Sequence, residues 1–205
     1  MARYLEIAAG FKRGLNWDAV RDVADPSKGV EKYDMRDLPM KGVADNTYDG
    51  VYNEHFIEHL DKADGIAFLM EMKRVLKPGG TIRTVWPPRE FVDKLLSDEP
   101  LTADEEFFCA AYHKFYVVQH GFCPKKYRNE SVRVQCAHGL LWQNGEHKYV
   151  WHKAELIDTL IKLGFIMIRE HKYQESRVSD FKGIDTDGKI RMLHSAVLEA
   201  QKPWS

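Results

Sequence analysis

Two acidic residues and a histidine in the segment YNEHFIEHL have the types and spacing of metal ligands. On a helix, Glu54, Glu58 and His59 would lie near one face. Carboxylates with one imidazole suit a hard divalent cation, which could hold a deprotonated hydroxyl group. His55 and His59, four residues apart, could instead chelate zinc, but no third ligand is evident. We predict no bound metal, with a divalent ion at Glu54, Glu58 and His59 as the open alternative.

A second set of metal-ligand types lies further along the chain. Two residues separate His120 from Cys123, and one separates Cys136 from His138, so four zinc ligands of acceptable type are present. Their spacing fits no common zinc ribbon or finger. With Cys109, the chain has three cysteines, an odd number without disulfide-framework spacing. We therefore expect reduced thiols.

Hydrophobic spacing and turn residues predict the elements that position these groups. Tyr48–Tyr52 is short and suits a buried strand. Residues 64–77 repeat apolar side chains every three or four positions, which predicts a helix. Pro78-Gly79-Gly80 should end it, because proline cannot continue the helical hydrogen bonds and glycine accepts left-handed backbone. A strand is predicted at 81–85, and the whole forms a crossover unit of a parallel sheet.

The same region resembles a known family. The pieces are DLPM at 37–40, DNTYDGVYNEHFIEHL at 45–60 and RVLKPGGTIRTVWP at 74–87. In this order they resemble class I S-adenosylmethionine-dependent methyltransferases, nearest to the methyltransferase type 11 group, over residues 33–87. The resemblance implies an α/β fold, a Rossmann-like three-layer sandwich whose seven-stranded sheet is mostly parallel with an antiparallel last strand. The E-x-x-x-E-H spacing also resembles the metal triad of ubiquinone-type O-methyltransferases, although in relatives without metal this histidine packs or caps.

The N-terminal segment departs from the family pattern. Residues 3–8 (RYLEIA) predict the first strand, and LEIAAG at 5–10 aligns with the family's LDLGCG turn. Alanine at position 8 replaces the first glycine of that turn, which adds a methyl group and disfavours positive φ. Six residues separate Gly10 from the next predicted strand, Trp17–Val23. A parallel crossover usually needs about a dozen, so we predict that the first crossover helix is absent or shortened, as in some short methyltransferase-like proteins.

The resemblance also implies a set of cofactor contacts. Asp22 would accept from both ribose hydroxyls, with Asp25 as the neighbouring alternative. Asp34 would accept from the adenine amino group, and the Met35 backbone N–H would meet a ring nitrogen. Each aspartate, taken singly, could instead be a surface, cap or turn residue. The predicted cofactor is S-adenosylmethionine, and its predicted contacts are Glu6, Ala8, Gly10, Asp22, Asp34, Met35 and Asn53.

Beyond Pro88 the family pattern loosens. Helices are predicted at 90–96 and 104–119, whereas 121–145 gives no clear prediction. We expect one domain over 1–205, with an insertion at about 88–150 that builds the acceptor lid, as this region does in small-molecule methyltransferases. His113 and His120 are the predicted bases, because histidine titrates near neutral pH. Tyr112 and Tyr116 are further candidates, and each of the four could instead be a packing aromatic or surface residue.

The C-terminal segment GEHKYVWHKAELIDTLIKLGF at 145–165 resembles the last crossover helix of the same group. Gly164 should end this helix, with a strand at 165–172 and the final antiparallel strand at 191–199.

Length and composition narrow the functional classes. The chain has 205 residues, 44% of them hydrophobic, which favours a globular protein over disorder. Thirty basic and 31 acidic residues give a net charge of -1, so bulk charge gives no signal for nucleic acid. No run approaches the roughly 20 apolar residues that span a bilayer, and no leader precedes the first strand. We expect a cytoplasmic protein without membrane contact and make no prediction of its oligomeric state.

The predicted function is methyl transfer from S-adenosylmethionine to a small-molecule or glycan-type acceptor. Such catalysis depends on aligning an acceptor lone pair with the methyl group, and it requires no protein nucleophile. The alternative is a non-catalytic methyltransferase-like module for binding or assembly that has lost the cofactor, which Ala8 and the short first connection motivate. A dehydrogenase is disfavoured, since no G-x-G-x-x-G follows the first strand.

Overall fold

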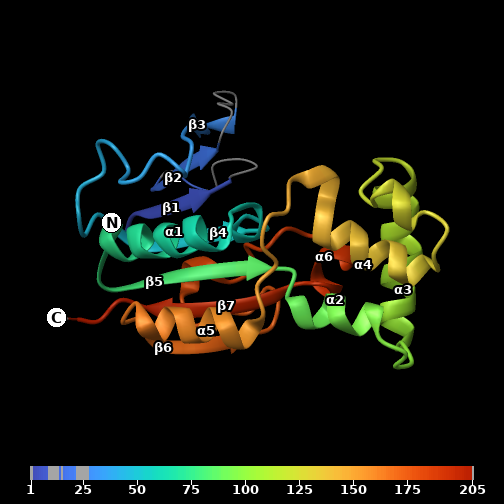
Figure 1. Ribbon diagram of the computed structural model, residues 1–205. Coiled ribbons are helices and arrows are strands. Elements are labelled where there is room, and N and C mark those ends of the chain that lie inside the picture. The colour runs from blue at the N-terminus through green and yellow to red at the C-terminus, as the bar shows by residue number, and fades with distance from the viewer. Residues whose placement is uncertain (1, 9–13, 15, 22–27, 205) are drawn as a thin grey trace.

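One mixed β-sheet organises the protein (Figure 1). The structure is a computed structural model that describes residues 2–8, 14, 16–21 and 28–204. Its seven-stranded sheet has the order β3-β2-β1-β4-β5-β7-β6, and β7 runs antiparallel to both neighbours. The strands are β1 (Tyr4–Ile7), β2 (Trp17–Arg21), β3 (Glu31–Lys32), β4 (Tyr48–Glu54), β5 (Leu76–Trp86), β6 (Ile166–His171) and β7 (Ala196–Gln201). The predicted α/β fold with an antiparallel last strand is confirmed.

The helices fall into two groups, one on the sheet and one beyond its end. The α-helices are α1 (Lys62–Val75), α2 (Arg89–Leu96), α3 (Ala103–Tyr112), α4 (Val132–Trp142), α5 (Lys153–Lys162) and α6 (Lys189–Leu193). The shorter elements are η2 (Ile57–His59), the π-helical η3 (His113–Val118), η4 (Lys125–Tyr127), η5 (Gln143–Gly145) and η6 (Ser179–Phe181). Among the described residues, every helix is too short or too polar to cross a membrane.

The connection from β1 to β2 is unusually short. These parallel neighbours are joined by residues 8–16, whereas a parallel crossover usually has about a dozen residues or more. The described residues of this connection, at 8, 14 and 16, are not helical. The predicted shortening of the first crossover therefore agrees with the described part of the connection.

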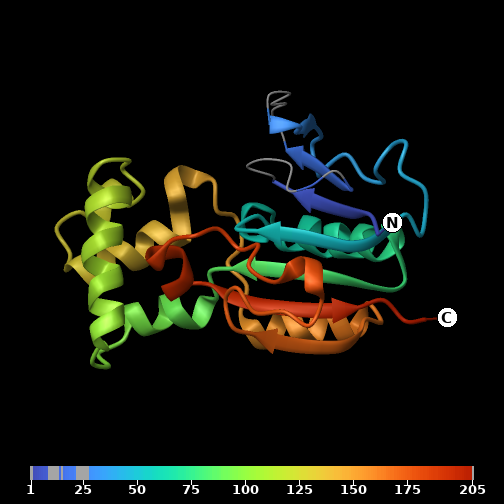
Figure 2. The same ribbon diagram turned by 180° about the vertical axis from the view of Figure 1, so that it is seen from behind.

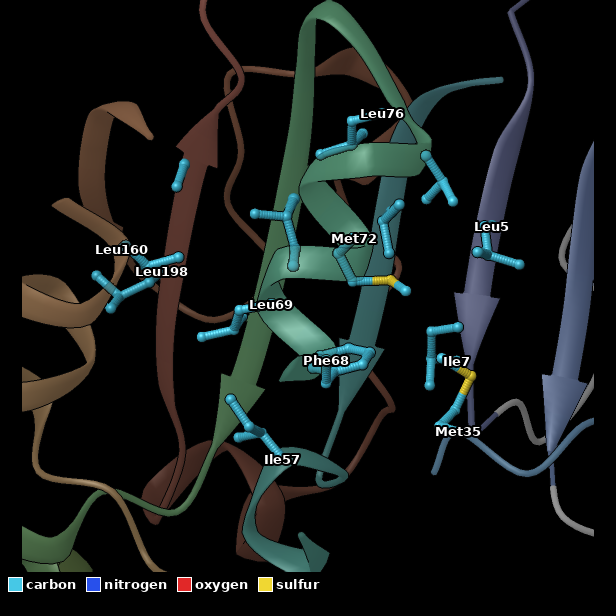
Figure 3. Packing of buried hydrophobic residues seen from close by; sticks show 14 of the residues in the cluster. Leu5, Ile7, Met35, Ile57, Phe68, Leu69, Met72, Leu76, Leu160 and Leu198 are labelled. Atoms are coloured by element: carbon cyan, nitrogen blue, oxygen red, sulfur yellow. The ribbon is translucent and has the colours of Figure 1, made fainter. Parts of the chain in front are cut away.

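Helices α1 and α5 cover one face of the sheet. Apolar residues of α1, among them Phe68 and Met72, pack against Leu5 and Ile7 of β1 (Figure 3). The helix begins at Asp61, whose carboxylate accepts a hydrogen bond from the Asp64 backbone N–H at 2.9 Å. This apolar layer fixes the strand ends against which a ligand could bind.

Irregular chain covers the opposite face (Figure 2). Residues 172–188 cross it, and Phe181 of η6 packs its ring on Tyr4 and Trp17, with centroid distances of 5.8 and 6.2 Å. Gly50 of β4 leaves the space for this ring, because a Cβ there would lie 2.7 Å from Phe181. A long loop thus supplies the third layer where a helix is usual.

The second group of helices forms a lobe beyond the carboxyl ends of the central strands. Helices α2, α3 and α4 with η3 enclose their own cluster of buried residues, which includes Phe108, Tyr112 and Leu140. Helix α3 begins with a capping box in which Thr102 and Glu105 bond each other's backbone N–H groups. Residues 121–145, which gave no clear prediction, contain η4, α4 and η5.

Three predicted boundaries are wrong. Helix α1 ends at Val75, before the Pro78-Gly79-Gly80 turn, because Leu76 is already extended and pairs with Tyr48 as the start of β5. The predicted helix at 104–119 changes to π geometry at His113. The last strand begins at Ala196, since residues 189–193 form α6.

Candidate functional site

A cavity of about 530 Å³ lies at the carboxyl ends of the parallel strands. β1 and β4 are adjacent there. The strand that follows β1 in the chain, β2, and the strand that follows β4, β5, lie on opposite sides of this pair in the strand order. Open parallel sheets bind ligands at this kind of switch point, and the volume is typical of a small-molecule site. Its walls come from the turns after β1, β3 and β4 and from a segment of the helical lobe, namely Ala8, Tyr33, Asp34, Met35, Arg36, His55, Phe56, His59, Leu60, Asn144, Gly145, Glu146 and Lys148.

The Ala8 backbone adopts the conformation expected of the glycine it replaces. Its φ is 57°, in the left-handed region that an L-residue disfavours, and the residue is exposed in the cavity wall. Ala8 itself therefore has a glycine-like backbone conformation, and its side chain lies in the cavity wall rather than in the core. Gly10, the other predicted contact of this turn, lies outside the described residues.

Asp34 lies in the cavity wall beside Arg36. Its carboxylate accepts hydrogen bonds from Arg36 Nε at 2.9 Å, Nη2 at 2.6 Å and the backbone N–H at 3.0 Å. These bonds lower the pKa of Asp34 to about 2. The carboxylate is therefore ionised and held in place, and a carboxylate with its four lone-pair sites can still accept from a ligand.

Met35 lines the cavity, whereas Glu6 does not. Met35 is buried beside Ile7 and lines the cavity (Figure 3). Glu6 is also buried, at 2% exposure, and alternates with Leu5 and Ile7, so its side chain points to the opposite face of the sheet. Asp22 and its neighbour Asp25 lie outside the described residues.

Asn53 and Glu54 are the last two residues of β4. Glu54 is therefore not on a helix, contrary to what its spacing to Glu58 and His59 suggests. Asn53 is buried in β4, where its side-chain amide donates to Thr84 Oγ1 at 3.1 Å, and it does not line the 530 Å³ cavity. Glu54 ends the strand and accepts from Thr186 Oγ1 at 2.6 Å and Tyr52 at 2.9 Å. Glu54 therefore does not share a face with Glu58 and His59, and the metal triad that was left open as an alternative does not assemble.

The second zinc alternative does not assemble either. Cys136 is buried and its thiol donates to the Cys109 carbonyl, while His138 stacks on the ring of Tyr127 at a centroid distance of 3.4 Å. Within the described ranges, one group of three metal-ligand side chains lies close together, and it consists of Glu58, His59 and His147. His147 was not among the predicted site residues. The sequence gives no signal for its approach to Glu58, because backbone hydrogen bonds between distant segments bring it there.

A smaller cavity of about 40 Å³ adjoins the first, and His55 lines both. Its other walls are Tyr112, Tyr116, Phe122, Leu140, Gln143, His147, Arg191 and His194. Burial lowers the pKa of His55 well below its usual value and that of His194 to about 3. Both imidazoles are therefore neutral near pH 7.

The predicted bases lie elsewhere. His113 bonds Gln135 at 3.1 Å on η3, and His120 is exposed beside Tyr116. Neither lines either cavity, whereas Tyr112 and Tyr116 both line the smaller one. The histidines that do line the cavities are His55, His59, His147 and His194. None of them was predicted as a base, and all but His147 lie outside the expected lid at 88–150.

Comparisons with known proteins give a family match to part of the chain and similar folds among solved structures. Residues 16–84 match the family of methyltransferase domains. A search of curated proteins found no match.

Among solved structures, a SAM-dependent methyltransferase from Archaeoglobus fulgidus has a TM-score of 0.55 and 17% identity, over 98% of this chain and 86% of that one. One from Thermotoga maritima has a TM-score of 0.51 and 18% identity, over 98% and 83%. The methyltransferase in a complex with the Trm112 activator from Haloferax volcanii has a TM-score of 0.52 and 13% identity, over 98% and 83%. At these identities the likeness shows a shared fold. Residues 16–84 therefore match the methyltransferase domain family, and the whole chain has the fold of S-adenosylmethionine-dependent methyltransferases.

Proposed function

We propose that the chain binds S-adenosylmethionine in the 530 Å³ cavity and transfers its methyl group to a small molecule held in the smaller cavity. One observation carries the proposal: the turns after β1 and β3, which bear Ala8 and Asp34, and the chain after β4, which bears His55, converge on a single cavity at the switch point. In this proposal Asp34 and Met35 hold adenine and Ala8 faces the methionine part. The ribose contact of Asp22 and the contact of Gly10 stay predictions from the family pattern, because both residues lie outside the described ranges.

The second cavity supports a small acceptor rather than a glycan chain. It is about 40 Å³ in volume, and aromatic rings from α3, η3 and the following turn surround it. Tyr112 is 3% exposed, and within the described part of the chain its hydroxyl has no hydrogen-bond partner, so it offers a polar contact to an entering molecule. We propose that residues 88–150, which supply most of this wall, are the acceptor lid.

Neutral His55 stands where the two cavities meet. An acceptor between its imidazole and the cofactor would have its lone pair directed at the methyl group, which is the main requirement of this chemistry. We propose that His55, rather than His113 or His120, is the histidine nearest the transferred group.

Replacing Asp34 by alanine tests the adenine contact. We expect the affinity for S-adenosylhomocysteine to fall by roughly 1–3 kcal/mol, because a buried amino donor of the ligand loses its acceptor. Isothermal titration calorimetry measures this directly. Asp37→Ala is the matched control, since Asp37 is exposed in the same turn and lines neither cavity. Equal affinities of the two variants would show that adenine binds elsewhere.

A further inference from the structure

Glu58 is a buried carboxylate without hydrogen bonds from any described residue. Its side chain is 0% exposed, and neither carboxylate oxygen has a hydrogen-bond partner there. A buried charged group is costly unless it is paired, hydrogen-bonded or bound to a metal. Glu54, the other carboxylate of the alternative metal triad, already accepts hydrogen bonds from Tyr52 and Thr186. Among the described residues, His55 Nδ1 lies 3.3 Å from Glu58 Oε1, and Oε2 is left without a polar partner.

His147 directs an unpartnered nitrogen at the same place. Its Nδ1 is hydrogen-bonded to the Leu140 carbonyl oxygen, which can only accept, so Nδ1 carries the proton. Nε2 then holds the lone pair, and among the described residues it has no hydrogen-bond partner although His147 is 7% exposed. A carbonyl that fixes the tautomer in this way is the usual support of a histidine that binds a metal.

Backbone hydrogen bonds hold these two residues together. The Glu58 carbonyl accepts from the backbone N–H groups of Lys148 at 2.8 Å and Tyr149 at 3.2 Å, which fixes the chain around His147 against η2. The rings of His59 and His147 meet edge to face, with centroids 4.8 Å apart. One ligand atom from each of Glu58, His59 and His147 lies within 4.8 Å of the others.

The side chain of His55 lies beside this cluster. Ser195 donates its hydroxyl proton to the Arg191 carbonyl at 2.7 Å, so it accepts from His55 Nε2 at 2.8 Å. His55 Nδ1 lies 3.3 Å from Glu58 Oε1, so this ring also borders the cluster.

We propose that Glu58, His59 and His147 bind one divalent cation of the zinc class. Two imidazoles with one carboxylate form a set typical of zinc sites that keep an open coordination position. Zinc bonds of about 2.0–2.1 Å require ligand atoms nearer than 4.8 Å, so small rotations of the side chains must accompany binding. Glu54 is not a ligand.

The proposed ion would lie between the two cavities, close to the proposed site of methyl transfer. His59 lines the larger cavity and His147 the smaller one, so the open position faces the region between them. If the proposed function holds, a hydroxyl oxygen of the acceptor is the group that this position would take and activate. Metal binding itself does not depend on the cofactor.

The experiment measures zinc binding by the full chain without S-adenosylmethionine. Protein dialysed against a chelator is titrated with Zn²⁺ in competition with a chromophoric zinc indicator, and Mg²⁺ is titrated separately. We expect one Zn²⁺ per chain with a submicromolar dissociation constant and Mg²⁺ binding at least about 100-fold weaker, since imidazole suits zinc and not magnesium. Glu58→Gln and His59→Ala should each weaken zinc binding at least about 100-fold, since loss of an outer-shell partner of a metal ligand already costs about 10- to 100-fold.

His152→Ala is the control, because His152 is a half-exposed histidine that lines neither cavity. Its zinc affinity should equal that of the unaltered protein. His59→Ala keeps the test decisive if Glu58→Gln folds poorly, since His59 is partly exposed. Unchanged zinc affinity in both ligand variants would overturn the proposal, as would the absence of stoichiometric zinc binding, which would indicate that a proton on Glu58 faces His55 instead.

Discussion

Replacing Arg83 by methionine is expected to destabilise the protein by about 3–5 kcal/mol, because it leaves two buried carboxylates without their cation. Arg83 on β5 is 0% exposed. Its Nε donates to Asp185 at 2.9 Å and its Nη1 to Glu199 at 2.8 Å. Burial opposes the charge, but these bonds outweigh it and raise the Arg83 pKa. Equilibrium unfolding in urea measures the loss.

Two controls separate the buried network from charge in general. Arg89→Met removes a half-exposed partner of Asp93, and we expect a change of about 0–1 kcal/mol. Adding Asp185→Asn and Glu199→Gln to Arg83→Met should recover a large part of the stability, because no unpaired charge remains. A loss below about 1 kcal/mol in Arg83→Met would show that the network contributes little.

The second large expected effect is the loss of cofactor affinity when Ala8 is replaced by a larger residue. Ala8→Leu places a branched side chain in the cavity wall, and we expect the affinity for S-adenosylhomocysteine to fall at least about 100-fold, or about 2.7 kcal/mol. Ala8→Gly is the matched control. It relieves an alanine at φ 57°, so affinity should hold or rise despite an entropic cost of about 0.5–1 kcal/mol to folding.

Calorimetry and thermal unfolding on both variants separate binding from folding. Because Ala8 is exposed and not packed in the core, neither change should disrupt the sheet. If Ala8→Leu binds the ligand as tightly as the unaltered chain, the turn after β1 does not contact the cofactor, and the cofactor binds at another position.

The sequence predicted the sheet well because its signals are local. The apolar repeat of α1 and the short crossover after β1 follow from spacing and from counting residues. The boundaries failed where tertiary pairing overrides local signals: Leu76 pairs with Tyr48 and starts β5 early, and residues 189–193 become helical although they precede the last strand directly.

The candidate site was predictable only where the family pattern names the residue. Ala8, Asp34 and Met35 were named from the family pattern, and all three line the cavity. Glu54 was assigned to a helical face, but β4 extends through it and His55 has a φ of 49°, which breaks the helical spacing. His147 reaches Glu58 through main-chain hydrogen bonds, and no side-chain pattern records such bonds.

Calorimetric titration of the unaltered chain with S-adenosylmethionine and S-adenosylhomocysteine tests the proposed cofactor site most directly. We expect one site per chain, with dissociation constants in the micromolar to high-micromolar range, because Ala8 keeps a glycine-like backbone conformation but carries an additional methyl group. Absence of binding at millimolar ligand would contradict this site, and would instead support a non-catalytic module for binding or assembly on the methyltransferase fold.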